Sequence, residues 1–337
     1  MNQENTRERQ AQPTAAQHND GLDPEIRAFV TKMGERWREH PAMSSVSIPE
    51  QRKIAEAVRS YWRQGGPQMA RTTDLQIPVD DKSVRVRVLD PVAKDGSAGP
   101  KPALVYLHGG GWTIFSIDTH DRLMREYAER AGIVLIAVDY TLSPEVRFPR
   151  ALDETLAVVH WLRAHGPEVG VDPGQIAVGG DSAGAAMTIA TCMRLRDAGQ
   201  GDVVKAMLLN YGAFDAACDT ESYERYGNGG YMWDSGEMYA FWQNYLGPDG
   251  DPKNPLAAPI HADVRDLPPA FMCIPECDVM FDESMVMADR LRRAGVSTQA
   301  VIYPGATHSF LEAVSISRIT NRAFDDASRW LSDMLRP

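Results

Sequence analysis

The sequence predicts an α/β protein with a mostly parallel sheet that helices cover on both faces. Short β-branched segments alternate with longer helical segments along most of the chain, as expected for βαβ units. Two of the expected strands, 103–107 and 175–179, are mainly apolar rather than alternating, which is typical of strands buried on both faces. A glycine-rich motif follows each of them, at the sheet edge where α/β proteins place their sites.

The N-terminal part is expected to differ from the rest of the chain. Residues 1–20 are polar and are predicted to be a disordered tail. Residues 21–68 are predicted to be N-terminal cap helices. Their apolar anchors are expected to be Trp37, Ile54, Val58, Tyr61 and Trp62. Residues 69–337 then form the catalytic domain.

The elements of that domain follow from the apolar pattern. Valine alternates with arginine over 84–88, which predicts a half-exposed strand. Further strands are expected at 103–107, 133–138, 175–179, 204–210, 270–275 and 298–303. Helices are expected near 118–131 and at 149–165, 183–198, 283–294 and 320–335. The aromatic-rich interval 211–265 interrupts this alternation, and we interpret it as a cap insertion that roofs the site together with the N-terminal helices. Ordinary packing of helices against the sheet is the alternative.

The segment 180–184 (GDSAG) lies between an expected strand and an expected helix. A G-x-S-x-G sequence in this context predicts a nucleophile elbow, in which Ser182 takes a strained backbone conformation at a sharp turn. Gly180 and Gly184 lack a Cβ and let the strand and the helix approach closely. A plain glycine- and serine-rich turn is the alternative for this motif taken alone.

A second motif, 108–112 (HGGGW), follows the expected strand 103–107. Three consecutive glycines can turn backbone N–H groups into one cavity, as an oxyanion hole requires. A phosphate-binding loop is the alternative, but the G-x-G-x-x-G and P-loop patterns are absent. An HGGG loop accompanies the elbow in lipases and esterases, with a further N–H from the residue after the serine, here Ala183. The two motifs together predict acyl transfer at Ser182.

The general base should follow the serine in the chain. Of the eight histidines, only His261 and His308 do so. His308 comes after an expected strand and a Pro-Gly loop, where a base can hang over the sheet, whereas His261 lies in a proline-rich connector and is expected at the surface. His108 is expected to be structural in the glycine loop. No such setting is found for His18, His40, His120, His160 and His165.

The acid that orients the base is expected after the strand 270–275. Asp278 lies on the loop that follows and is favoured over Glu276. Asp282 is expected to be the N-cap of the next helix, and Glu283 to lie in its first turn. The role of the acid is to hold the imidazole tautomer and stabilise the imidazolium.

These motifs make the chain resemble the bacterial hormone-sensitive-lipase-like branch of the α/β-hydrolases. The resemblance spans about residues 70–335 and also includes 138–140 (VDY), 143–145 (SPE), 148–149 (FP), 267–270 (LPPA), 282–283 (DE) and Phe310. It implies the α/β-hydrolase fold, with a mostly parallel eight-stranded sheet, helices on both faces and a helical cap. It implies a cofactor-free esterase with Ser182 as nucleophile, His308 as base and Asp278 as acid. It also implies N–H donors at Gly110, Gly111 and Ala183.

Composition limits the partners and the location. A net charge of −11 argues against nucleic acid. The absence of 18 consecutive apolar residues argues against a membrane span, and the polar N-terminus shows no secretory signal, so a cytoplasmic protein is expected. The four cysteines lack metal spacing and are expected to be reduced thiols. No cofactor or metal is expected; the expected partner is a small-molecule ester, and a homodimer is left open.

The sequence therefore predicts a serine carboxylesterase for short- to medium-chain acyl esters, working through a Ser-His-Asp triad and an acyl-enzyme. A deacetylase or amidase acting on one metabolite with the same triad is the first alternative. A non-catalytic ligand-binding receptor on the same fold is the second, and the presence of His308 argues against it.

Overall fold

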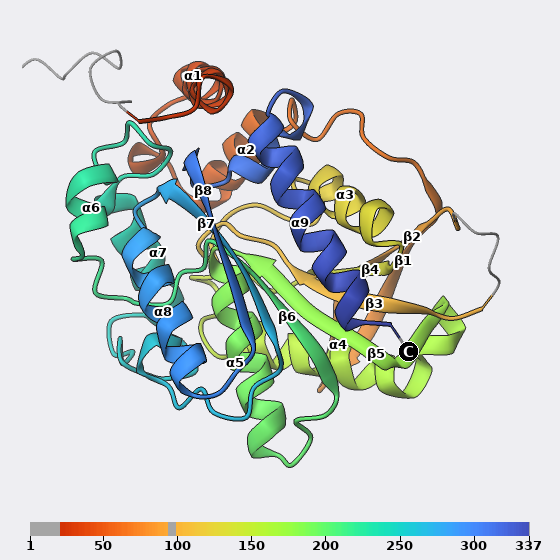
Figure 1. Ribbon diagram of the computed structural model, residues 1–337. Coiled ribbons are helices and arrows are strands. Elements are labelled where there is room, and N and C mark those ends of the chain that lie inside the picture. The colour runs from red at the N-terminus through yellow and green to blue at the C-terminus, as the bar shows by residue number, and fades with distance from the viewer. Residues whose placement is uncertain (1–20, 94–98, 337) are drawn as a thin grey trace, which may run out of the picture.

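The computed structural model describes residues 21–93 and 99–336, and within these ranges the chain forms an eight-stranded sheet between two layers of helices (Figure 1). The strands are β1 Met69–Val79, β2 Lys82–Pro91, β3 Lys101–Leu107, β4 Val134–Asp139, β5 Val171–Asp181, β6 Val204–Asn210, β7 Ala270–Cys277 and β8 Thr298–Thr307. Their spatial order is β1-β2-β4-β3-β5-β6-β7-β8. The tail predicted at residues 1–20 lies outside the described residues.

The sheet is mostly parallel, as predicted. Strand β2 runs antiparallel to β1 and β4, and the neighbours from β4 to β8 are parallel. Strand β1 is the one strand of this sheet that the apolar pattern does not predict. It is an edge strand in which only Ile77 and Val79 are buried; its first half, 69–74 (MARTTD), is mostly polar, and Pro78 interrupts the short alternation that follows, so its apolar pattern is weak.

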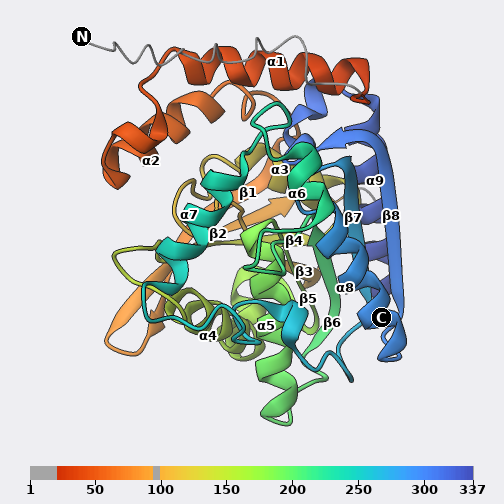
Figure 2. The same ribbon diagram turned by 90° about the vertical axis from the view of Figure 1, so that its left-hand side faces the viewer.

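Helices cover both faces of the sheet. They are α1 Pro24–Arg38, α2 Ile48–Arg59, α3 Asp121–Ala131, α4 Arg150–His165, α5 Ala183–Asp197, α6 Glu221–Tyr226, α7 Ser235–Leu246, α8 Phe281–Arg293 and α9 Arg318–Met334. Helices α3 and α9 pack together on one face, and α4, α5 and α8 lie on the other (Figures 1 and 2). Each helix predicted in the catalytic domain is therefore present, with ends that differ by a few residues.

The N-terminal segment forms two helices, α1 and α2, which lie along one end of the molecule (Figure 2). Of the expected apolar anchors, Ile54, Val58 and Trp62 are buried and Trp37 is partly buried. The prediction is wrong for Tyr61, which is 46% exposed. Its ring touches Trp62 edge-on, with centroids 5.0 Å apart, and the Arg36 guanidinium lies over it at 5.8 Å, so these two contacts leave the side chain partly open to solvent.

The interval 211–265 contains α6, α7 and a short 3₁₀ helix at Pro259–His261. Helix α7 begins with a capping box, in which the Asp234 carboxylate accepts the Glu237 N–H and the Glu237 carboxylate accepts the Asp234 N–H. The Tyr245 ring of α7 stacks on the Trp112 ring with centroids 4.0 Å apart. This aromatic contact holds α7 against the loop that follows β3.

Two details near the C-terminal strands differ from expectation. The Pro304-Gly305 pair is not in a loop but lies within β8, which bulges so that 304–306 stand opposite Glu276. Strand β8 is at the sheet edge, so the missing N–H of Pro304 is tolerated. Asp282 is not the N-cap of α8 as expected; Met280 occupies that position and Asp282 lies in the first turn with Glu283.

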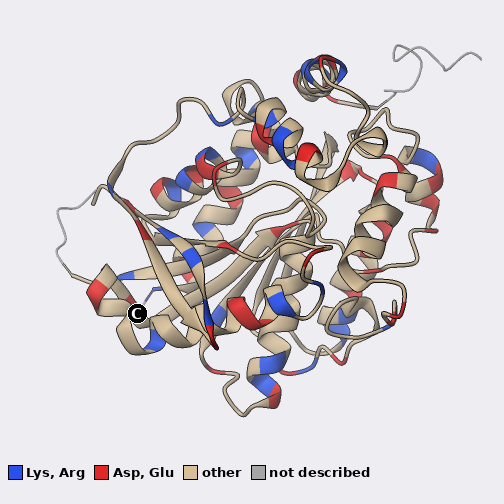
Figure 3. Cartoon of the chain, turned by 180° about the vertical axis from the view of Figure 1, so that it is seen from behind, with Lys and Arg blue, Asp and Glu red and all other residues tan. Residues whose placement is uncertain are grey.

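Charged residues of both signs are intermingled on the face shown in Figure 3. Over residues 21–93 and 99–336, none of the helices has the length and apolar character needed to cross a bilayer. Cys192, Cys218, Cys273 and Cys277 are all unpaired thiols, which agrees with the expectation of reduced cysteines.

Candidate active site

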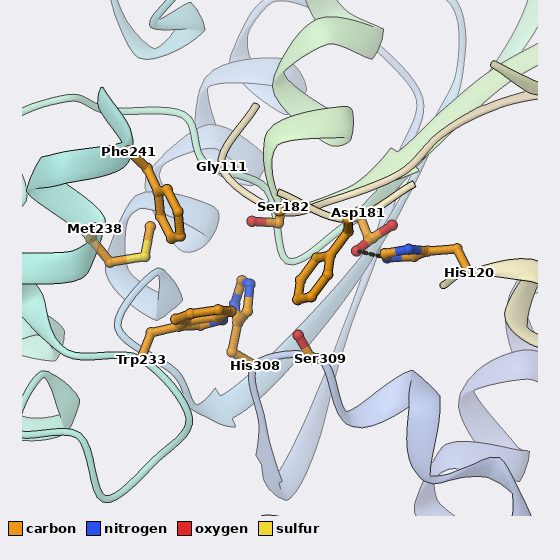
Figure 4. Close-up of a pocket in the computed structure, with 11 residues that line it drawn as sticks. Gly111, His120, Asp181, Ser182, Trp233, Met238, Phe241, His308 and Ser309 are labelled. Atoms are coloured by element: carbon orange, nitrogen blue, oxygen red, sulfur yellow. Dashed lines mark ion pairs between the residues drawn. The ribbon is translucent and has the colours of Figure 1, made fainter. Parts of the chain in front are cut away.

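The backbone at Ser182 is strained. Its φ of 54° and ψ of −118° are rare for a residue with a side chain. The Ser182 N–H donates to the Asn210 carbonyl at 2.9 Å, and the Ser182 carbonyl accepts the N–H groups of Ala185 and Ala213, both at 3.1 Å. These bonds hold the turn between β5 and α5, and the hydroxyl points into a cavity (Figure 4).

Close backbone contact brings the two sequence motifs together. A Cβ on Gly184 would overlap the Leu107 carbonyl at the end of β3, and a Cβ on Gly180 would meet the same atom. Only glycine permits this approach of β3 to the start of α5. The glycine loop that follows Leu107 is thereby placed beside Ser182.

The glycine loop turns through backbone conformations that favour glycine. Gly110 has a φ of 114° and Gly111 a φ of 56°. The Gly110 carbonyl accepts the N–H groups of Thr113 and Ile114, both at 3.0 Å, which closes the turn. Gly110 and Gly111 line the cavity that Ser182 faces, and Ala183 begins α5, where the first N–H groups have no partner within the helix. The arrangement offers N–H donors to an anion near the Ser182 hydroxyl.

The structure brings His308 and Asp278 together across 30 residues of sequence. His308 follows β8, Asp278 follows β7, and Nδ1 of the imidazole lies 2.8 Å from Oδ2 of the carboxylate. Both side chains are buried. A carboxylate at Nδ1 requires a proton on that nitrogen, so Nε2 is left free to accept a proton within the cavity.

Hydrogen bonds of the preceding residue, Thr307, fix the backbone that carries His308. The Thr307 hydroxyl lies 2.9 Å from the Cys277 carbonyl of β7 and 2.6 Å from the Tyr231 carbonyl, which belongs to the 211–265 interval. The carboxylate of Asp278 is held in turn by the Met280 N–H, at 3.0 Å from Oδ1. Besides their contact with each other, Asp278 is thus held by the Met280 N–H and His308 by the anchored Thr307 before it.

The other acids of this region have structural contacts. Glu276 is exposed and accepts the Gly305 N–H at 2.9 Å, inside the β8 bulge. Asp282 accepts the Ser222 N–H at 2.8 Å, and Glu283 accepts the Phe214 N–H at the same distance. Burial raises the pKa of Glu283 well above its ordinary range. Asp278 is therefore the acid of this group that contacts His308.

A small cavity joins these groups (Figure 4). It has room for about 10 Å³, near the minimum that one water needs. Its polar side is formed by the glycine loop and by the side chains of Ser182, His308, Ser309, His120 and Asp181. Its apolar wall consists of Phe115, Trp233, Met238 and Phe241. Three of these four apolar side chains come from the 211–265 interval.

A larger groove of about 630 Å³ lies on the other side of this wall. Trp233 and Phe241 line both spaces, and their rings meet edge-on with centroids 5.5 Å apart. The far side of the groove is formed by residues of α1 and of the turn after it, including Met33, Trp37 and Met43. The two rings thus separate the small cavity from the groove beneath the N-terminal helices.

The sequence does not identify which apolar residues line the cavity. Trp233 and Phe241 belong to the aromatic-rich interval expected to form the cap, but nothing in the sequence distinguishes them from the aromatics that pack elsewhere, and Phe115 and Met238 carry no motif at all. His120 lies at the start of α3 and reaches Asp181 beneath the cavity, although it follows no expected strand. Position in the chain gave no signal for these contacts. No group of three His, Cys, Asp or Glu residues suited to a metal ion occurs in the described part of the chain.

The chain as a whole is similar to known proteins. A family model described as alpha/beta hydrolase fold matches residues 104–312. The chain is 35% identical to an ethyl acetate hydrolase of Pseudomonas putida, over 88% of this chain and 93% of that protein. It is 32% identical to an acetyl esterase of Salmonella typhi, over 92% of this chain and 94% of the relative. An esterase structure from Pyrobaculum calidifontis superposes with a TM-score of 0.83 at 30% identity, covering 93% of this chain and 99% of the other.

Proposed function

Because this chain belongs to the alpha/beta hydrolase family, in its hormone-sensitive-lipase-like branch, we propose that it is a serine carboxylesterase acting on short acyl esters. The observation that carries the proposal is the strained Ser182, which faces the same cavity as the glycine loop and the paired His308. The relatives named acetyl esterase and ethyl acetate hydrolase point to small-molecule esters as substrates.

The first half of the proposed reaction forms an acyl-enzyme. The Ser182 Oγ attacks the ester carbonyl while His308 Nε2 takes the hydroxyl proton. The carbonyl oxygen becomes an oxyanion, and the N–H groups of Gly110, Gly111 and Ala183 stabilise it. When the C–O bond breaks, His308 returns its proton to the leaving alcohol.

The second half releases the acid. Water gives a proton to His308 Nε2 and attacks the acyl carbon, through a second oxyanion in the same N–H cradle. The Ser182 oxygen then leaves and recovers the proton. In both halves Asp278 holds the Nδ1–H tautomer and stabilises the imidazolium, which is the role that its 2.8 Å contact supports.

The N-terminal helices and the 211–265 interval serve, in this proposal, as a cap over the site. The groove lies between them, so an ester would enter there and reach Ser182 past Trp233 and Phe241. Helix α2 also supports the glycine loop, because Arg52 donates to the Thr113 carbonyl at 2.8 Å. A cap of this kind excludes water and strengthens each hydrogen bond to the oxyanion.

Acyl chain length tests the proposed function. We expect kcat/KM on p-nitrophenyl esters to rise over the first few carbons, by about fourfold per buried methylene at about 0.8 kcal/mol each. It should reach a maximum between acetyl and octanoyl, because longer chains meet the wall of Trp233 and Phe241 and overpack it at a cost of about 1–3 kcal/mol. A profile still rising at palmitoyl, or activation at a lipid interface, would contradict the assignment to short esters.

We expect the wall between the cavity and the groove, formed by Trp233 and Phe241, to determine the acyl chain length at which kcat/KM is highest. Replacing Phe241 with alanine removes a ring that lines both spaces, so the maximum should move by at least two carbons toward longer chains. The measurement is the same ester series, with circular dichroism to check folding, since truncating a buried Phe costs about 3–5 kcal/mol. The matched control is Tyr239→Ala, two residues earlier on α7 and 57% exposed, which should keep the wild-type profile. An unchanged maximum in folded Phe241→Ala would show that the acyl chain lies elsewhere.

A further inference from the structure

A buried carboxylate lies directly behind the glycine loop. Asp181 ends β5, immediately before Ser182, and is 3% exposed. Its Oδ1 accepts the Tyr106 hydroxyl at 2.9 Å and the Gly109 N–H at 3.1 Å. The Asp181 side chain therefore anchors the loop whose next residues face the cavity.

The second oxygen of this carboxylate faces a buried histidine. Asp181 Oδ2 lies 3.4 Å from His120 Nε2, and both side chains border the cavity (Figure 4). The other ring nitrogen, His120 Nδ1, lies 2.9 Å from the Thr119 hydroxyl oxygen. That hydroxyl already donates to the Ser116 carbonyl at 2.7 Å, so it can only accept from His120. Both nitrogens of His120 thus face acceptors, and this is the geometry of an imidazolium.

A negative charge at Asp181 would oppose the chemistry proposed for Ser182. The carbonyl oxygen becomes anionic beside the glycine loop, and Asp181 lies behind the same loop, in surroundings where charges are weakly screened. A buried carboxylate without a counter-charge would repel that oxyanion. Asp181 can anchor Gly109 at no electrostatic cost to the reaction only if a cation lies close to it.

We propose that His120 is a positively charged positioning residue, whose imidazolium neutralises Asp181 and so lets this carboxylate hold the oxyanion loop without repelling the oxyanion. This inference rests on the proposed esterase function. His120 acts through Asp181 and the loop.

The charges around His120 support this state. Burial disfavours the imidazolium, but Asp181 and Glu312 favour it, and the pKa of His120 is raised on balance. Glu312 favours the positive charge, and Arg59, which is paired with Glu312, opposes it. The ring of His108, 5.5 Å away between centroids, is neutral, because burial and the charge of His120 lower the pKa of His108 to about 3.

The charge state can be measured directly on the full-length protein. Long-range ¹H–¹⁵N spectra of ¹⁵N-histidine-labelled protein at about pH 7.5, one unit above the ordinary histidine pKa, should show the His120 ring with both nitrogens protonated. That signal should vanish in His120→Gln and persist in His160→Gln, an exposed control on α4. A neutral His120 ring at this pH would overturn the inference. The result does not depend on which bond the enzyme hydrolyses, so it is separate from the proposed function.

Kinetics test whether the charge matters. His120→Gln leaves Asp181 buried and unpaired, so kcat should fall about 10- to 100-fold with KM changed little. Adding Asp181→Asn removes the unpaired charge. The kcat of the double variant should therefore be at least about tenfold higher than that of His120→Gln alone. A residue needed only for packing would give no recovery. A double variant no faster than His120→Gln would therefore overturn the inference.

The pH profile supplies a second kinetic signature. Because the pKa of His120 is raised in the folded protein, its imidazolium persists to higher pH than that of an ordinary histidine and is lost as pH rises through that pKa. Wild-type kcat should fall on the alkaline side, and the double variant should lack this fall. An identical alkaline limb in both proteins would contradict the proposed role.

Discussion

Replacing Ser182 with alanine should lower kcat for ester hydrolysis about 10⁴- to 10⁶-fold, the range seen when a catalytic nucleophile is lost. The proposed acyl-enzyme cannot form without the Ser182 Oγ, and only the N–H cradle and substrate binding remain. The hydroxyl points into the cavity, whereas the strained turn is held by backbone bonds. Thermal unfolding should therefore be nearly unchanged, and the comparison of kcat with melting temperature is the measurement.

A covalent probe separates Ser182 from its neighbour in the cavity. An organophosphonate should label the wild-type protein once, and mass spectrometry should place the label on Ser182. Ser309 lines the same cavity, so Ser309→Ala is the matched control and should still be labelled. A Ser182→Ala variant that keeps a tenth of the wild-type rate, or a label on Ser309, would refute the assignment of the nucleophile.

Replacing Asp278 with asparagine should lower kcat about 10⁴-fold. An amide at this position can donate to Nδ1 and so favours the tautomer in which Nε2 carries the proton and cannot accept another. It also removes the charge that stabilises the imidazolium. The kinetics of Asp278→Asn on the preferred ester, with melting temperature measured in parallel, give the test.

The neighbouring acids provide controls for this result. Glu276→Gln should remain within a few fold of the wild type, because Glu276 is exposed and bonds only the β8 backbone among the contacts described here. Asp282→Asn should affect mainly the contact to Ser222 and hence stability. If Glu276→Gln were the crippling change instead, the acid would have been assigned to the wrong residue.

The sequence alone predicted most of the fold because its signals are local. Buried central strands are apolar, helices follow them, and the glycines at 109–111, 180 and 184 mark turns that only small residues allow. The same logic placed Ser182 at a strand-to-helix junction, where the structure shows the strained φ of 54°. Edge strand β1 escaped prediction because its first half is mostly polar and exposed, which leaves only a short apolar pattern at its end.

Contacts between distant segments were decided by the tertiary structure. His308 meets Asp278 rather than Glu276 because β7 ends at Cys277: Asp278 lies in the turn after the strand, whereas Glu276 is still in the strand and bonds the β8 bulge. Trp233 and Phe241 become the cavity wall because α7 stacks on Trp112.

The contact between His120 and Asp181 was also decided by the tertiary structure. Its sequence neighbours resemble those of any helix start, and its charge follows from a carboxylate 61 positions along the chain that shares its buried environment. Sequence determined which groups are present and where the chain turns. The tertiary structure decided which side chains pair and which form the cavity wall, because these contacts join residues far apart in the sequence. Protonation depends on burial and on nearby charges, which a local sequence pattern does not encode.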